Sequence, residues 1–172
     1  MIVVFGGKGT VHHLEQFLIQ LTEFSQEEDI TVQALDATVV YGKEHLISAA
    51  EHALRAFQQG TQSTNSLSLE LLLYASGDRQ IKKAIAKMGV KQGKRSVAFV
   101  VIDSKTRERK AYEKVIDRLL NTIGFSRDDT VLDGDRETLK RFGIRQQELR
   151  TVPEQKYGEI ILEKVALVDV IK

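Results

Sequence analysis

Residues 96–102, SVAFVVI, are the feature that most constrains the fold of this chain. The run is apolar and rich in β-branched side chains, and it has the length of a strand rather than of a helix. Such a run is typical of a strand buried at the centre of a sheet. We therefore expect a sheet around it, with further strands at residues 1–5, ended by Gly6 and Gly7, and at residues 30–35.

Amphipathic helices are expected between and after these strands. In residues 11–24, Leu14, Phe17, Leu18 and Leu21 recur at the spacing of one helix face, and residues 25–29 then form an acidic turn. Further helices are expected over residues 43–59, 65–76, 78–88, 105–123 and 136–142, and from residue 153 towards 171, with residues 143–152 irregular. The sequence thus predicts one mixed α/β (α+β) domain spanning residues 1–172, with about three to five strands packed by about six to eight helices.

Composition and motif spacing exclude several classes of function. The chain has no cysteine, which excludes disulfides, thiolate-bound metals and a cysteine nucleophile. No apolar run approaches a membrane span, and the N-terminus lacks the pattern of a secretory signal. Lys8 follows two glycines but lacks the Walker spacing, and the four histidines are not spaced as metal ligands and are expected at solvent-facing or core-rim positions. We therefore expect no catalytic residue, no metal and no cofactor.

Charge is unevenly distributed in a chain whose net charge is only +1. Residues 9–42 contain six acids and no Lys or Arg, whereas residues 79–95 contain seven basic residues and no acid. At helical spacing the second segment separates into an apolar face (Ile81, Ala84, Ile85 and Met88) and a basic face (Arg79, Lys82, Lys83 and Lys87). This helix follows a turn of small residues, and N–H groups at helix N-termini bind phosphates. The pattern favours nucleic-acid binding, and a merely solvated lysine-rich face is the alternative.

The C-terminal segment carries more apolar residues than one helix face needs. Nine of the twelve residues 160–171 are apolar, with Leu167 and Ile171 on one side of the expected helix and Leu162 and Val165 nearly opposite. One side is expected in the core and the other at a partner interface. A helix, or a terminal strand, buried wholly within its own domain is the alternative.

Three segments, in this order, resemble a known family. They are Asp36-Ala37 and Val39-Val40 leading to Lys43, His45 and Ala49-Ala50; Ala75-Ser76-Gly77 followed by Arg79-Gln80-Ile81; and the tail Leu162–Leu167. The chain resembles the small subunit of the KEOPS (EKC) complex, the family that includes the p53-related-protein-kinase-binding protein. The resemblance covers about residues 30–95 and 155–170.

The resemblance implies a non-catalytic subunit of mixed α and β fold, with no metal or cofactor of its own. Members support the formation of N6-threonylcarbamoyl-adenosine at position 37 of ANN-decoding tRNAs. They dock on the N-lobe of the small atypical kinase/ATPase subunit and through it reach the threonylcarbamoyl-transferase subunit, and archaeal members bind the 3′ CCA end of tRNA. A cytoplasmic location, also nuclear in a eukaryote, and no membrane partner are expected.

Two surfaces follow from the residues and the resemblance together. The expected tRNA-binding residues are those of the turn, the basic face and the segment near residue 43: Ser76, Gly77, Arg79, Gln80, Lys82, Lys83, Lys87, Lys43 and His45. Tyr41, Tyr74 and His45 are candidates for base stacking. The expected kinase interface lies on the last helix: Leu162, Val165, Ala166, Leu167, Val168 and Ile171. A protein scaffold without RNA binding remains the alternative, and a small-molecule enzyme using Lys8 or His45 is a third, less favoured one.

Overall fold

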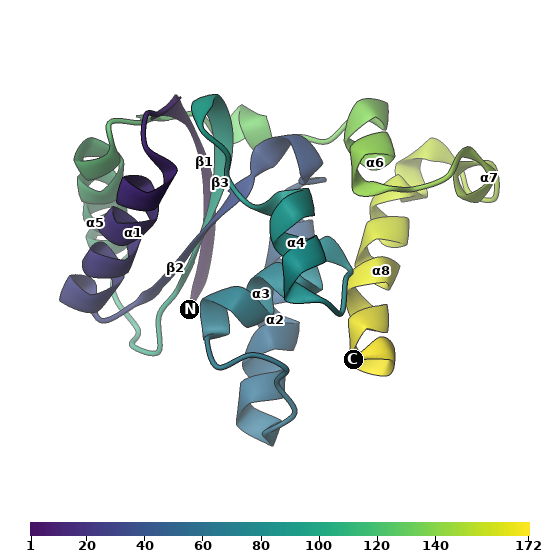
Figure 1. Ribbon diagram of the computed structural model, residues 1–172, viewed down its shortest axis with the longest axis horizontal. Helices are drawn as coiled ribbons and strands as arrows, with labels where there is room; N and C mark the ends of the chain where they lie inside the picture. Colours follow the sequence, from purple (N-terminus) through teal and green to yellow (C-terminus); the bar gives the residue numbers. More distant parts are fainter.

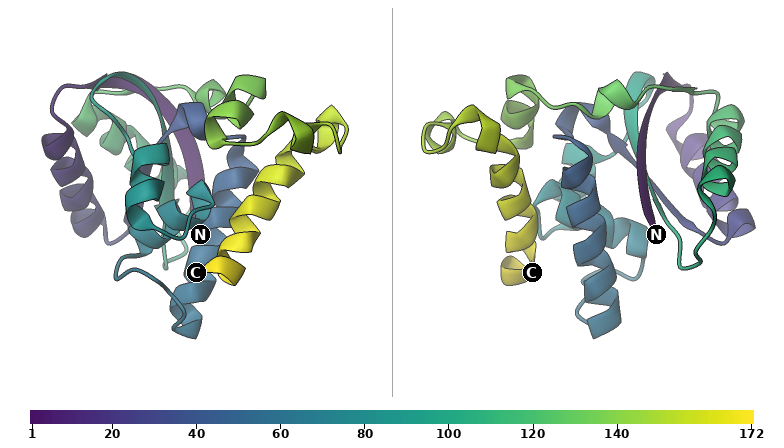
Figure 2. Two further views of the ribbon diagram at one scale, coloured as in Figure 1. Left: turned by 45° about the vertical axis from the view of Figure 1, so that its right-hand side comes forward. Right: turned by 180° about the vertical axis from the view of Figure 1, so that it is seen from behind.

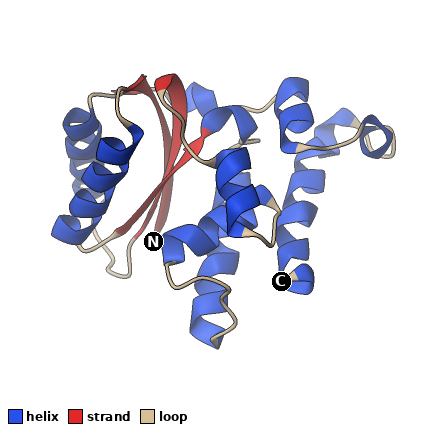
Figure 3. Ribbon diagram, in the orientation of Figure 1, coloured by secondary structure: helices blue, strands red, loops and turns tan.

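A four-stranded sheet lies at the centre of the computed structural model, which describes residues 1–172 (Figure 3). The strands are β1 (Ile2–Val11), β2 (Thr31–Asp36), β3 (Gly93–Ile102) and β4 (Ser126–Arg127), in the spatial order β2-β3-β1-β4. Every neighbouring pair is antiparallel. The central strand predicted from residues 96–102 is confirmed as β3, in which Val97, Ala98, Phe99 and Val100 are fully buried.

The chain has eight helices: α1 (Leu14–Glu28), α2 (Lys43–Gln59), α3 (Leu67–Ser76), α4 (Ile81–Met88), α5 (Arg109–Ile123), α6 (Arg136–Phe142), α7 (Gln146–Leu149) and α8 (Tyr157–Ile171). Three short 3-10 turns lie at Ala37–Val39, Asp129–Leu132 and Glu154–Lys156. The predicted α+β class is confirmed, with the numbers of strands and helices inside the expected ranges.

The helices form layers on both faces of the sheet. Helices α1 and α5 cover one face, and α2, α3 and α4 cover the other (Figure 1). The apolar core is correspondingly split into a cluster of 16 residues on the α1 side and one of 29 residues on the α2 side. Helix α8 packs on α2 and α3 rather than on the sheet, so it forms an outer layer together with α6 and α7 (Figures 1 and 2).

The prediction that glycines end the first strand is wrong. Strand β1 continues through Gly6, Gly7 and Gly9 to Val11 and pairs with β3 along its whole length. A Cβ atom on Gly9 would lie 2.5 Å from the ring of Phe125, and one on Gly6 would lie 2.5 Å from the carbonyl oxygen of Asp128. The glycines therefore allow the segment after α5 to approach the strand closely.

Several helix boundaries differ from the prediction. Residues 25–28 form the last turn of α1, which ends at Asp29 in the left-handed conformation (φ 55°), not an acidic turn. Helix α1 starts only at Leu14, because Val11 is still paired in β1. Helices α4 and α5 start three and four residues later than expected, and α7 lies within the stretch predicted to be irregular.

The predicted inward position of Ile85 is also wrong. Ala84 and Met88 are fully buried, but Ile85 is 48% exposed because α4 packs through a stripe narrower than its apolar face. Ile85→Ala should therefore lower the free energy of unfolding by about 1 kcal/mol or less, and Met88→Ala by about 2–5 kcal/mol. Urea denaturation followed by circular dichroism measures both, and equal losses would contradict this packing.

Candidate functional site

The turn between α3 and α4 is formed by the sequence Ser76-Gly77-Asp78. Gly77 ends α3 in the left-handed conformation (φ 70°), and its N–H donates to the carbonyl of Tyr74. The hydroxyl of Ser76 donates to the carbonyl of Leu73 (2.9 Å) and accepts from the N–H of Asp78 (3.2 Å). Ser76 is fully buried. Its side chain therefore fixes the turn and is not available to a ligand.

Two side chains bind the last carbonyl groups of α3, which have no partner within the helix. His45, on α2, accepts from the N–H of Tyr41 at Nδ1 (3.1 Å) and donates from Nε2 to the carbonyl of Ala75 (2.7 Å). Lys87, on α4, donates from Nζ to the carbonyl of Ser76 (2.6 Å). The turn is thus held from two neighbouring helices.

His45 is fully buried and Lys87 is half-buried, and burial lowers the pKa of both side chains. His45 is 1% exposed, and burial, with a contribution from the Lys87 charge, lowers its pKa to about 4, although its bond to Ala75 acts the other way. Burial also lowers the pKa of Lys87, whose Nζ lies 3.7 Å from the ring centre of Phe142. The expectation that His45 lies at a solvent-facing or core-rim position is therefore wrong, and Lys87 contacts the ring of Phe142 within the protein.

The rest of the predicted basic face is exposed. Arg79, Gln80, Lys82 and Lys83 lie at the start of α4, and the three cations form no ion pair. Gln80 is the N-cap of α4 and makes no capping hydrogen bond, so the first N–H groups of the helix have no side-chain partner. The structure thus brings three cations and a helix N-terminus to one surface, which we call the α4 surface.

The remaining candidates are less available. Lys43 is exposed at the start of α2, where its Nζ lies 3.7 Å from Asp129. Gly77 is half-buried in the turn, and Tyr41 is half-buried against Gly134. Tyr74 is fully buried, so the expectation that it stacks on bases from the surface is wrong.

Helix α8 has one buried and one exposed side. Val165 and Val168 are fully buried against α2 and α3, so the expectation that they face a partner is not met. Leu167, Val170 and Ile171 are 41%, 77% and 44% exposed, Ala166 is exposed, and Leu162 is half-buried. The exposed apolar side of α8, which we call the α8 surface, therefore comprises Ala166, Leu167, Val170 and Ile171.

A polar network that the sequence analysis missed fixes the C-terminal end of α8. Asp169 accepts hydrogen bonds from the hydroxyl of Tyr74 and from Nδ1 of His52 (2.8 Å), and Lys172 donates to Glu70 (2.9 Å). Burial and the bond to Asp169 raise the pKa of Tyr74 to about 12. Burial opposes ionisation of Asp169 and Glu70, but their hydrogen bonds hold both pKa values below the ordinary range. These partners come from α2, α3 and the C-terminal end of α8, which lie far apart along the chain, so no sequence motif indicates that they are in contact.

The α4 surface and α8 lie close together. A Cβ atom on Gly77 would lie 3.4 Å from Cβ of Lys164, so α8 passes directly behind the turn. Lys164 also donates to Glu148 (2.7 Å), which ties α8 to α7. Both views of Figure 2 show α8, in yellow, running beside α2, with its outer side not covered by another helix. None of the helices is long and apolar enough to cross a lipid bilayer.

Comparison with known proteins places the chain in a class of proteins described as kinase-binding. Residues 11–169 match the family model "Kinase binding protein CGI-121". The chain belongs to the CGI-121 family. It is also 34% identical over 142 residues to "Regulatory protein Cgi121" of Methanocaldococcus jannaschii, covering 81% of this chain and 84% of that protein. The family resemblance inferred from the sequence motifs is thereby confirmed.

Proposed function

We propose that this protein is a non-catalytic accessory subunit of the KEOPS complex. It supports formation of N6-threonylcarbamoyl-adenosine in tRNA by binding the atypical kinase/ATPase subunit and the 3′ CCA end of tRNA, in the cytoplasm (and nucleus, in a eukaryote). The observation that carries the proposal is membership of a family described as kinase-binding, with a relative described as regulatory.

The kinase-binding part of the proposal uses the α8 surface. An exposed apolar stripe on a helix whose opposite side is already packed is suited to a partner protein. The stripe continues towards the acidic Glu159 and Glu163 on the same helix, which are exposed. We assign the N-lobe of the kinase to this side, and the threonylcarbamoyl-transferase subunit joins the assembly through the kinase.

The tRNA-binding part uses the α4 surface. Arg79, Lys82 and Lys83 have no carboxylate partner, so they are available to phosphates of a single-stranded end, and Gln80 to a base edge. Lys43 is a further candidate. Ser76, His45 and Lys87 hold the turn in shape, and so take part only indirectly.

The tRNA prediction is tested by charge reversal on the isolated protein. Lys83→Glu should weaken binding of full-length tRNA by at least about tenfold, and Lys110→Glu, the same change at an exposed site on α5, should not. With about three phosphates neutralised, log K against log salt should fall with a slope near −2. Both variants should keep the wild-type melting temperature, since exposed substitutions usually change stability by about 0.5 kcal/mol or less.

A second arm tests recognition of the end. Trimming the CCA nucleotides from the tRNA should weaken binding by at least about tenfold, because each stacked base contributes about 1–3 kcal/mol. Equal affinity for trimmed and intact tRNA, measured by filter binding, would overturn end recognition. If the affinity for tRNA were also independent of salt concentration, the alternative function, a kinase-binding scaffold without direct RNA contact, would be favoured.

A further inference from the structure

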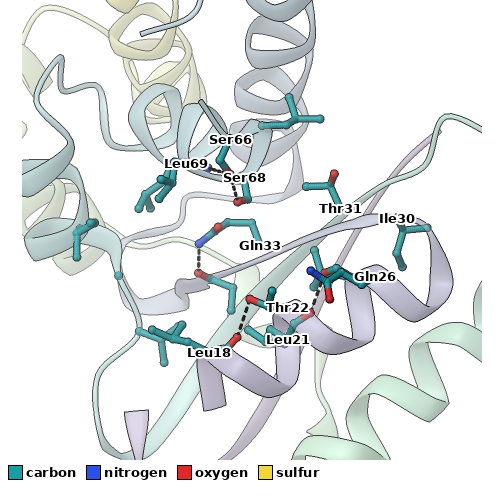
Figure 4. A pocket seen from close by; sticks show the side chains of 18 of the residues that line it. Leu18, Leu21, Thr22, Gln26, Ile30, Thr31, Gln33, Ser66, Ser68 and Leu69 are labelled. Carbon is teal, nitrogen blue, oxygen red and sulfur yellow. Dashed lines mark hydrogen bonds between the residues drawn. The ribbon is translucent and has the colours of Figure 1, made fainter. Parts of the chain in front are cut away.

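Strand β2 is an edge strand, and a groove runs along its free edge. The order β2-β3-β1-β4 leaves one side of β2 without a neighbouring strand. Helix α1 forms one wall of the groove, and α3 and α4 form the other, as the close-up in Figure 4 shows. The groove has a volume of about 470 Å³. None of the residues that define the α4 surface or the α8 surface lines it, although Ile85 of α4 does.

The lining is neutral and mainly aliphatic. Of its 19 residues 11 are apolar, including Leu18, Leu69 and Ile85, and the others are glycine or carry a hydroxyl or amide group. The lining contains no charged side chain and no aromatic ring. It therefore offers nothing to hold a phosphate or stack a base, which disfavours RNA as the occupant.

The edge of β2 presents backbone groups to this groove. The side chain of Gln33 lines the groove and donates from Nε2 to the carbonyl of Ala34 (2.7 Å; Figure 4). That carbonyl therefore points away from β3. In an antiparallel pair, alternate residues direct both N–H and C=O to the same side, so Val32 also presents its groups to the groove. Such groups are matched by an extended backbone.

The α1 rim of the groove adds negative charge. Glu15 and Glu23 border Leu18 and Thr22 on the α1 side, and neither forms an ion pair. Helix α1 contains no Lys or Arg. A second copy of this chain is a poor occupant, because antiparallel pairing of two β2 strands about a two-fold axis would set acidic α1 beside acidic α1. An occupant with basic side chains on that side is complementary.

We propose that the free edge of β2 binds an extended segment of a partner protein by strand addition. The segment is aliphatic at alternate positions, and its Lys or Arg residues face the acidic rim of α1. Two of the exposed large apolar side chains, Leu18 and Ile85, line this groove and would be covered. β2 has six residues, about 20 Å, enough for a segment of similar length.

The probe is a pool of capped heptapeptides based on Thr-Val-Lys-Val-Thr-Val-Lys, with Val varied to Ile and Leu. The two lysines lie about 13 Å apart on one face of a strand, close to the about 12 Å along α1 between Glu15 and Glu23. Added to the ¹⁵N-labelled full chain, the pool should shift the amide signals of Val32 and Ala34 and slow their hydrogen exchange. The same peptides N-methylated at alternate residues should bind at least tenfold more weakly, because methylation removes backbone N–H donors and leaves the side chains unchanged.

Matched variants locate the site. Leu18→Glu and Ile85→Glu should each weaken peptide binding at least tenfold, whereas Leu167→Glu on α8, at a similarly exposed residue, should leave it unchanged. All three sites are at least 40% exposed, so the variants should fold, which the melting temperature checks. The proposal is overturned by absence of binding at millimolar peptide, by equal binding of the N-methylated pool, or by amide shifts on α8 instead of β2. A CCA oligonucleotide that shifted the β2 amides would equally overturn it.

Discussion

Val165→Glu should lower the free energy of unfolding by at least about 4 kcal/mol, a large part of the total for a domain of this size. Val165 is fully buried in the apolar cluster that α8 shares with α2 and α3, so the new carboxylate would be removed from water. The loss combines the missing burial of valine, about 1.5–3 kcal/mol, with the cost of a buried charge. Urea denaturation followed by circular dichroism gives the value.

The matched control is Leu167→Glu, two residues further along the same helix. Leu167 is 41% exposed, so the free energy of unfolding of this variant should lie within about 0.5 kcal/mol of the wild-type value. It should nevertheless lose affinity for the atypical kinase subunit by at least about tenfold, as measured by titration calorimetry, while binding tRNA as wild type does. A Leu167→Glu protein as unstable as Val165→Glu would mean that α8 is packed on both sides, and normal kinase binding by this variant would move the docking site elsewhere.

Stability should also fall by about 3 kcal/mol between pH 6.5 and pH 4 because of His45 alone. The pKa of His45 is about 4 in the folded protein, against an ordinary value of 6.5, and burial is the main cause. Between these values the unfolded chain binds a proton that the folded chain does not, so acid favours unfolding. Protonation would also end the hydrogen bond that Nδ1 accepts from Tyr41.

The comparison of wild type with His45→Gln isolates this effect. Glutamine does not titrate and can offer both an acceptor to Tyr41 and a donor to the carbonyl of Ala75. The difference in unfolding free energy between the two proteins should therefore change by about 3 kcal/mol from pH 7 to pH 4. A difference independent of pH would mean that His45 is solvated or already paired with an acid. Losses from Glu70 and Asp169, whose pKa values are lowered, set in as the pH approaches their ordinary pKa values of 4.5 and 3.8, and they are common to both proteins.

The sequence predicted which segments form helices and strands better than it predicted which side of each helix faces the core. The two-sided apolar pattern of α8 indicated both a core and an exposed side, but only contacts with α2 and α3 assign Val165 inward and Leu167 outward. For His45 a local signal was present. It lies four residues before the buried Ala49, and thus on the inward face of α2.

Other features depend on packing between distant segments. From the local sequence, the glycines of β1 could either end the strand or lie within it. The close approach of Phe125 to Gly9 explains why they lie within it. The network of Asp169, Tyr74 and His52 joins three helices. The free edge of β2 follows from strand order, which periodicity does not encode.

The strand order also has a consequence for how the chain acquires its structure. β1 and β2 precede β3 in the chain but are not paired with each other, and β2 pairs only with β3. Ile2 pairs with Ile102, so a loop of about a hundred residues has to close before the start of β1 can form backbone hydrogen bonds with β3. During synthesis on the ribosome, both early strands therefore stay unpaired until residues 93–102 have emerged. Contacts this distant along the chain place folding nearer the millisecond-to-second range than the microsecond range of helical bundles.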